Sequence, residues 1–205
     1  MVRRSEQQAQ TRRRLVDSAE RAFVAHGFDV ASLEQITRDA GLTRGAFYAN
    51  FADKGQLLAA VAERVFARHA TALDAVDVRA PAQTWFRAIP RRGPWFALCL
   101  EAVRAGIDEP TVRDRIEAAW GLLSAAVERL VERAIAAHQL RPLLPARDLA
   151  AVLVAVRIGV LVERELTADP LAPGTYPLVV AQLLGLVEGG GREASPGPAV
   201  PPTAG

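Results

Sequence analysis

The 205-residue chain has only one cysteine and three histidines, the residue types that most often build redox and transition-metal sites. Its single cysteine, Cys99, cannot form an internal disulfide, and a lone thiol is more often a small buried core residue than a redox sensor. The three histidines, His26, His69 and His138, lie far apart without the spacing of metal ligands, so we expect no metal. There is no nucleophile–base pairing and no phosphate-cradling glycine motif before a helix, so we expect neither an enzyme nor a cofactor.

Long apolar runs are also missing. The longest, residues 149–162, is fourteen residues long and is interrupted by Arg157, whereas a membrane-spanning helix needs about 20 residues. Residues 3–14 are almost wholly polar, so the N-terminus has no signal-peptide core. We therefore expect a soluble, cytoplasmic protein with no membrane partner.

The net charge is only +2, from 25 basic and 23 acidic residues, but its distribution is uneven. The excess lies in residues 1–54, which hold nine Lys or Arg and seven Asp or Glu, whereas residues 55–205 are neutral. The first fourteen residues contain five arginines and one glutamate. Such a basic end is either a solvated arm or a segment that lies along nucleic-acid phosphates.

Helical periodicity dominates the rest of the pattern. Leu15, Ala19 and Phe23 share one apolar helix face and predict a helix from about residue 10 to 25, ended by Gly27. No run alternates as a strand would, so the fold class is all-α. Capping boxes and first-turn prolines predict further helices over residues 33–40, 43–51, 54–76, 81–89, 94–105, 110–138, 146–166 and 176–187.

The segment Ala40-Gly41-Leu42-Thr43 joins two short predicted helices in the manner of a helix-turn-helix, whose second helix enters the DNA major groove. Gly41 permits the sharp turn, and small residues after Thr43 allow close approach to base edges. The alternative is a plain helical corner in which Gly41 is only a cap. The predicted DNA-binding residues are Arg12, Arg13, Ser32, Thr43, Arg44, Gly45, Ala46, Tyr48, Asn50 and Lys54.

Over residues 11–58, one set of residues occurs in order and without gaps: Thr11, Arg12, Ala19, Phe23, Gly27, Phe28, Ser32, Leu33, Ile36, Ala40, Gly41, Leu42, Thr43, Gly45, Phe47, Tyr48, Phe51, Lys54 and Leu57. This set resembles the N-terminal domain of TetR-family transcriptional regulators. The resemblance implies an all-helical homodimer with a three-helix DNA-binding head and a C-terminal domain that binds a small-molecule effector and dimerises. It places phosphate contacts on Thr43, Tyr48 and Lys54, and base contacts on Arg44, Gly45 and Ala46.

Four positions depart from the family pattern and leave the operator sequence open. Ala31 stands where threonine is common, Thr37 where a small apolar residue is usual, and Asn50 where histidine is frequent. Ala46 lacks a hydroxyl that is often present. The expected domains are a basic disordered arm over 1–9, the helix-turn-helix domain over 10–54, the effector-binding and dimerisation domain over 55–188, and a disordered tail over 189–205.

Aromatic residues gather on the middle helices, where the resemblance implies an effector pocket. The alternative for each of them is that it simply fills the core. The predicted pocket residues are Phe66, Trp85, Phe86, Trp95, Phe96, Cys99, Trp120 and Leu123.

The helices over 146–166 and 176–187 are apolar around much of their circumference, which favours a four-helix bundle across a two-fold axis over a monomer with a thick core. Arg157 either pairs with an acid at this interface or binds an acidic effector. The predicted interface residues are Val152, Val156, Arg157, Val160, Leu183 and Leu184.

These patterns favour a ligand-responsive transcriptional regulator. We expect a repressor that a small apolar or amphipathic effector releases from a pseudo-palindromic DNA operator. The alternative is a helical small-molecule-binding or interaction module that does not bind DNA.

Overall fold

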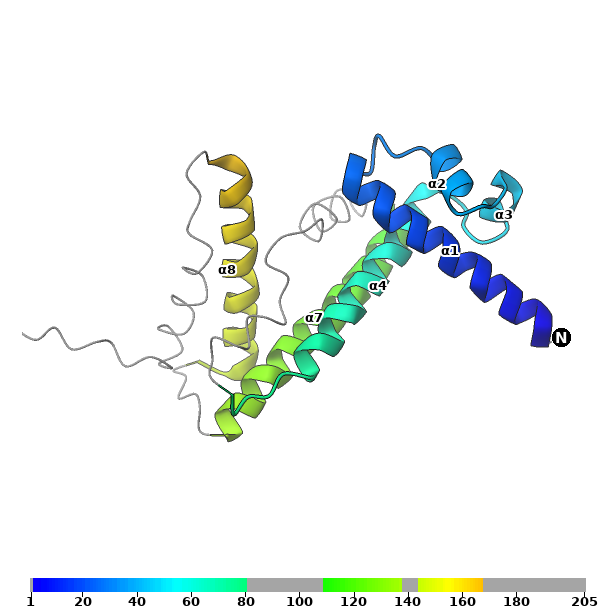
Figure 1. Cartoon of the computed structure of the whole chain (residues 1–205). Helices are drawn as coiled ribbons and strands as arrows, with labels where there is room; N and C mark the ends of the chain where they lie inside the picture. The colour runs from blue at the N-terminus through cyan, green and yellow to red at the C-terminus, as the bar shows by residue number, and fades with distance from the viewer. Residues whose placement is uncertain (1, 81–108, 138–143, 168–205) are drawn as a thin grey trace, which may run out of the picture.

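The computed structural model describes residues 2–80, 109–137 and 144–167 (Figure 1). Its elements in these ranges are helices, and the described part contains no strand. The labels follow Figure 1: α1 (Val2–His26), α2 (Leu33–Asp39), α3 (Arg44–Tyr48), α4 (Lys54–Asp74), α7 (Pro110–Ala136) and α8 (Ala146–Leu166). The helices predicted over 81–89, 94–105 and 176–187, and the predicted tail, lie outside the described residues.

The prediction of a disordered arm over residues 1–9 is wrong for residues 2–9, because α1 begins at Val2. The prediction used apolar periodicity, which starts only at Leu15. The segment Glu6–Gln10 has no apolar face, but its glutamate, glutamines and alanine all favour a helix. In Figure 1 the first turns of α1 project beyond the other helices, and residues 5–10 are exposed.

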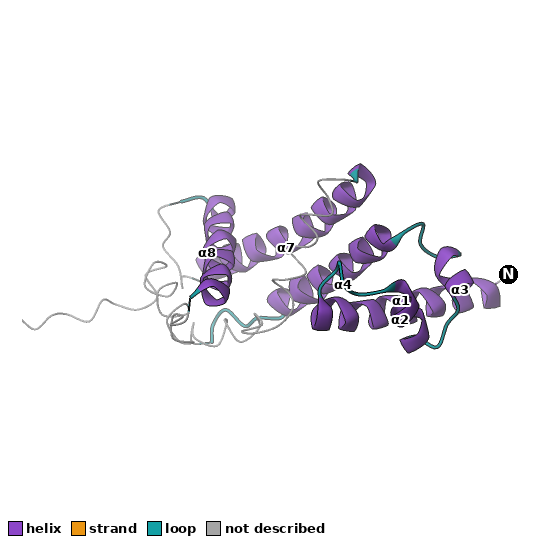
Figure 2. Ribbon diagram, turned by 90° about the horizontal axis from the view of Figure 1, so that it is seen from above, coloured by secondary structure: helices purple, strands orange, loops and turns teal. Residues whose placement is uncertain are grey.

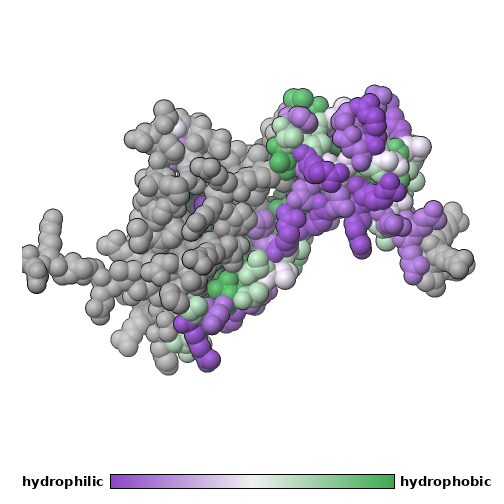
Figure 3. Space-filling model, viewed as in Figure 1, coloured by the Kyte–Doolittle hydropathy of each residue, from purple (hydrophilic) through white to green (hydrophobic). Residues whose placement is uncertain are grey.

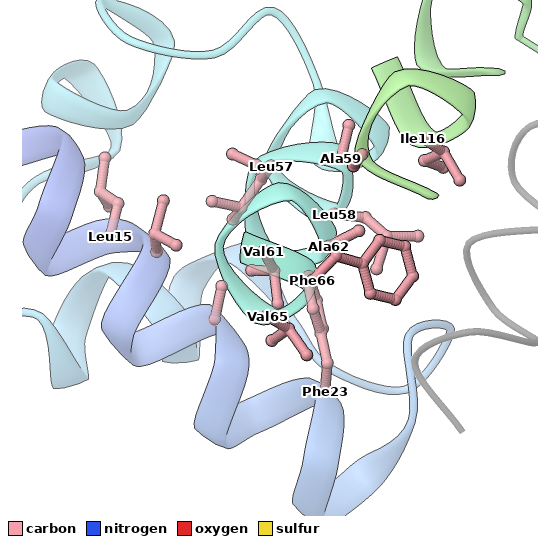
Figure 4. Packing of buried hydrophobic residues seen from close by; sticks show 14 of the residues in the cluster. Leu15, Phe23, Leu57, Leu58, Ala59, Val61, Ala62, Val65, Phe66 and Ile116 are labelled. Atoms are coloured by element: carbon pink, nitrogen blue, oxygen red, sulfur yellow. The ribbon is translucent and has the colours of Figure 1, made fainter. Parts of the chain in front are cut away.

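One hydrophobic core joins α1, α2 and α3 to α4 and α7. Figure 4 shows Leu15 and Phe23 of α1 on one side of α4, and Ile116 of α7 on the other. Leu57 and Val61 of α4 are fully buried between them. Because α4 packs against both α1 and α7, a shift of α4 against α7 would move the first three helices as well. We call α1, α2 and α3 the head, and the helices from α4 onward the body.

Ion pairs add to the contact between α1 and α4. Arg64 of α4 pairs with Asp17 and Glu20 of α1, and Arg68 pairs with Glu20 at 2.9 Å. Burial raises the pKa of Glu20, but hydrogen bonds from Arg68 and Arg64 outweigh burial and leave that pKa below its ordinary value. The stabilisation from this carboxylate is therefore present at neutral pH and is lost as the pH falls through the lowered pKa.

Arginines of α7 hold both ends of α4. Near the start of α4, Arg115 makes two parallel hydrogen bonds to Glu63, at 2.7 and 2.8 Å, and donates to the side-chain oxygen of Gln56 at 2.6 Å. At the other end, Arg129 pairs with Asp74 at 2.7 Å and lowers its pKa, and Arg133 donates to the last carbonyls of α4. The head is thus attached to a firmly coupled pair of helices.

The last described helix, α8, packs against α7 through a second, smaller cluster built on Val131, Ala134 and Leu149. Its bounds are those predicted from the sequence. Among the described helices, none has the length and apolar character needed to cross a membrane.

Candidate DNA-binding surface

The turn between α2 and α3 has the predicted geometry. Ser32 caps α2 by accepting a hydrogen bond from the Gln35 amide at 3.1 Å, and Gly41 takes a φ of +62°. Arg14 of α1 donates to the Ala40 carbonyl at 2.6 Å, and a Cβ added to Gly41 would lie 2.8 Å from the same guanidinium. Gly41 is therefore favoured by its left-handed backbone conformation, whereas the Arg14 guanidinium is the end of a flexible side chain that can move away from an added Cβ.

The second helix, α3, begins where it was predicted to begin but is shorter. Thr43 caps it by accepting from the Ala46 amide at 3.2 Å, and the helix ends at Tyr48 instead of residue 51. Phe47 is fully buried, and its ring stacks on Phe51 with 5.8 Å between centroids. This inward anchor leaves Thr43, Arg44, Gly45 and Tyr48 exposed on the outer side.

Arg44 and Tyr48 form one polar unit on this outer side. They lie one helical turn apart, and a hydrogen bond to the Tyr48 side chain raises the pKa of Arg44. Tyr48 is 53% exposed, while the edge of its ring rests against Phe47 at 5.0 Å between centroids. A cation and a hydroxyl are therefore both exposed on this side of α3. Figure 3 shows that this part of the molecule is largely hydrophilic.

Three of the predicted DNA-binding side chains also have partners inside the head. The Arg12 guanidinium lies 4.3 Å from the centroid of the Phe51 ring and donates to the Asn50 carbonyl, and burial lowers its pKa. The side-chain amide of Asn50 donates to the Ala46 carbonyl at 2.8 Å. Lys54 donates to the Asp29 carbonyl at 3.1 Å and lies over a phenylalanine ring. Arg13, by contrast, is exposed.

Sequence reasoning missed the role of Arg14, which it counted only as part of a basic segment. This side chain reaches across 26 residues to the turn, and no local pattern indicates such a contact. Two departures from the family pattern are explained by packing. Ala31 is buried, with 4% of its surface exposed, and the buried Thr37 hydroxyl donates to the Glu34 carbonyl at 3.1 Å.

The predicted effector residues are only partly placed. Phe66 and Leu123 are buried in the main core, and the ring of Trp120 meets Phe66 edge-on at 5.8 Å between centroids. These contacts are those of core residues between α4 and α7. The other predicted pocket residues, Trp85, Phe86, Trp95, Phe96 and Cys99, lie outside the described residues.

The predicted dimer residues of α8 lie in three different environments. Val156 and Val160 pack against the cluster between α7 and α8, Arg157 is buried, and Val152 is 44% exposed. Leu183 and Leu184 lie outside the described residues.

Comparison with known proteins identifies the family. Residues 15–61 match the family described as "Bacterial regulatory proteins, tetR family", and residues 94–176 match "Tetracyclin repressor-like, C-terminal domain". Together these two matches cover more than half of the chain. The chain belongs to the TetR family.

Individual TetR-family relatives support the assignment. The HTH-type transcriptional repressor Rv1474c of Mycobacterium tuberculosis is 29% identical over 187 residues, covering 91% of this chain and 95% of that protein. The HTH-type transcriptional repressor AcnR of Corynebacterium diphtheriae is 32% identical over 124 residues, covering 60% and 65%. The reduced form of Escherichia coli NemR shares the fold, with a TM-score of 0.70, 18% identity, and coverage of 85% and 97%. This TetR-family chain is a DNA-binding transcriptional regulator with an all-α fold.

Gly45 offers a test of close approach between α3 and DNA. A Cβ added there would meet only the Thr43 hydroxyl, at 3.8 Å, so the fold has room for Gly45→Ala. We expect this variant to melt at or slightly above the wild-type temperature, because alanine favours a helix over glycine. We expect specific operator binding to weaken by about 30-fold or more, since each of the two half-sites has one misplaced base contact that costs about 1–3 kcal/mol.

Thermal melting and a fluorescence-anisotropy titration on operator DNA measure the two effects separately. Ala49→Ser, an exposed change just after α3, is the matched control and should change neither. Wild-type affinity in Gly45→Ala would show that α3 does not approach the bases closely at this position.

Proposed function

We propose that the chain is a dimeric repressor whose two α3 helices enter successive major grooves of a pseudo-palindromic operator. The observation that carries this proposal is the exposure of Arg44 and Tyr48 on α3, on the side opposite the buried Phe47. In this arrangement Arg44, Gly45 and Ala46 read base edges, while Thr43, Tyr48 and Lys54 contact phosphates. A two-fold dimer requires half-sites about one helical turn apart, or a multiple of it.

Further contacts to phosphates would come from α1 and from the residues that cap α2 and α3. Arg13 is exposed, and Ser32 and Thr43 present hydroxyls beside the amide ends of α2 and α3. Amides at a helix start favour an anion. Arg12 and Asn50 would act mainly by holding α1 against the turn after α3.

A small-molecule effector bound in the body would release the operator. Such a ligand acts only if it binds one arrangement of the two heads more tightly than the other. The shared core and the Arg64 ion pairs would make α1 follow any movement of α4. A change in the spacing of the two heads would then move both α3 helices out of register with DNA.

The phosphate contacts predict a steep salt dependence of operator binding. Each phosphate neutralised by a cation releases counterions, so the logarithm of affinity should fall linearly with the logarithm of salt concentration. Replacing the exposed Arg13 by glutamine should reduce that slope by about 1 per half-site and weaken binding to all sequences alike. Gel-shift titrations between about 50 and 200 mM salt, on DNA from upstream of its own gene, measure the slope.

Arg79→Gln is the matched control, because Arg79 is an arginine in the body, beyond the end of α4. Binding that is insensitive to salt would refute the phosphate contacts, and an absence of any specific shift would refute the repressor.

A further inference from the structure

The first turns of α1 form an exposed and almost wholly polar surface. Residues 5–10 are exposed, and the contacts of α1 with the hydrophobic core begin only at Leu15. In Figures 1 and 2 this end of α1 projects beyond the other helices, at the same end of the molecule as α3. A short polar helix is marginal in water unless it packs against something. The segment is therefore a candidate docking surface.

Contacts further along α1 fix the position of this segment relative to α3. The helix is continuous from Val2 to His26. Arg14 donates to the Ala40 carbonyl in the turn before α3, at 2.6 Å, and Arg12 donates to the Asn50 carbonyl after α3, at 3.2 Å. The two arginines hold α1 against the loops on either side of α3, so the first turns of α1 extend from the DNA-binding surface in a defined direction.

One face of the segment continues the face of α1 that meets the turn before α3. At helical spacing, Arg3, Gln7 and Gln10 share a face with Arg14. With a rise of about 1.5 Å per residue, Gln7 lies about 10 Å and Arg3 about 16 Å further along the axis than Arg14. The major groove of DNA is about 12 Å wide. The segment is thus long enough to span from the phosphates at the start of α3 to those about one groove width away.

The chemistry of the segment favours DNA as its partner. The first fourteen residues contain five arginines and one glutamate, which is complementary to a phosphate backbone. Glutamine side chains, of which residues 5–10 hold three, donate hydrogen bonds to phosphate oxygens. A protein partner would need large apolar or aromatic anchors, and Ala9 is the only apolar residue of this segment. The surface is also continuous with the exposed Arg13 and the DNA-binding head.

We propose that the first turns of α1 bind DNA phosphates about one groove width outside the bases that α3 reads. The contact is made by a rigid helix, not by a flexible basic arm, and it adds affinity without reading sequence. This inference rests on the proposed function, because it takes α3 to lie in the major groove. It lengthens each half-site by about three to four base pairs, at about 3.4 Å per pair.

The first test uses an operator selected from random DNA, either with long flanks or trimmed at the edge of the selected bases. The wild type should bind the trimmed duplex about tenfold more weakly, because the outer phosphate contacts are lost. Arg3→Gln/Arg4→Gln should bind the long duplex about tenfold more weakly and should not respond to trimming, since both changes remove the same contacts. Arg79→Gln/Arg147→Gln, the matched control, removes equal charge from exposed arginines of the body and should respond to trimming like the wild type.

The second test separates a rigid helix from a flexible arm. Gln8→Pro keeps every charge but breaks the helix, because proline lacks an amide hydrogen and clashes with the carbonyl four residues earlier. In hydroxyl-radical footprints it should lose protection of the flanking pairs while keeping protection of the selected bases. Gln8→Ala keeps the helix and should give the wild-type footprint. Both variants should melt like the wild type, because Gln8 is exposed and lies outside the core.

The outcomes separate this contact from the proposed function. Wild-type affinity of Arg3→Gln/Arg4→Gln on both duplexes would overturn the contact and leave base reading by α3 intact. Flank protection that survives Gln8→Pro would overturn the rigid helix and point to a flexible arm. Failure of the wild type to select any operator would instead overturn the proposed function itself.

Discussion

Replacing Tyr48 by alanine is expected to weaken specific operator binding by about 100-fold or more, because two half-sites each lose about 1–3 kcal/mol. The variant loses the exposed hydroxyl and, with it, the polar partner of Arg44 one helical turn away. The fold should change little, because Tyr48 is 53% exposed. Anisotropy titrations at one fixed salt concentration, on an operator selected from random DNA, measure the loss.

Tyr48→Phe is the matched variant, because it keeps the ring edge against Phe47 and removes only the hydroxyl. Its binding should fall by about tenfold, as expected for one hydrogen bond of about 0.5–1.5 kcal/mol in each half-site. Both variants should remain dimers of wild-type affinity, since Tyr48 lies in the head. Unchanged binding by Tyr48→Ala would exclude the outer side of α3 as the DNA-reading surface.

The parts of the fold that could be predicted are those determined by short-range contacts. The caps at Ser32 and Thr43, the sharp turn at Gly41 and the bounds of α8 agree with the prediction. Each depends on a few neighbouring residues, such as a side-chain oxygen that accepts an amide three residues on. The resemblance to the TetR family, drawn from the same segment, is confirmed by both family matches.

The parts that could not be predicted depend on residues far apart in the chain. Arg12 reaches the Asn50 carbonyl across 38 residues, and Arg115 reaches Glu63 across 52. Neither partner is indicated by the pattern around the arginine. The early start of α1 was missed for a different reason, since a polar helix has no apolar period to detect.

For α8, it was hardest to predict which residues face α7 and which are exposed on the surface. This helix is apolar on several sides, so periodicity alone does not tell which side meets α7 and which meets another chain. The structure assigns Val156 to the contact with α7 and leaves Val152 exposed. The DNA contacts of the head and the effector pocket stay predictions.

Replacing Phe47 by alanine is expected to destabilise the head by about 3–5 kcal/mol, a large part of the stability of a typical domain. Phe47 is fully buried and contacts the rings of both Phe51 and Tyr48. A helix of five residues is too short to persist alone, so α3 depends on this anchor. Operator binding should be lost although Arg44 and Tyr48 remain in the chain.

Thermal melting and amide hydrogen exchange test this together, because the loss of protection should centre on residues 33–51. Phe47→Leu is the control: it keeps most of the buried volume, should cost about 1–1.5 kcal/mol, and should retain specific binding. The decisive comparison is between the folding and the DNA binding of the Tyr48→Ala and Phe47→Ala variants. Tyr48→Ala should fold without reading DNA, whereas Phe47→Ala should fail to bind because α3 is no longer held. Wild-type protection of α3 in Phe47→Ala would mean that the cap at Thr43 positions the helix without the buried ring.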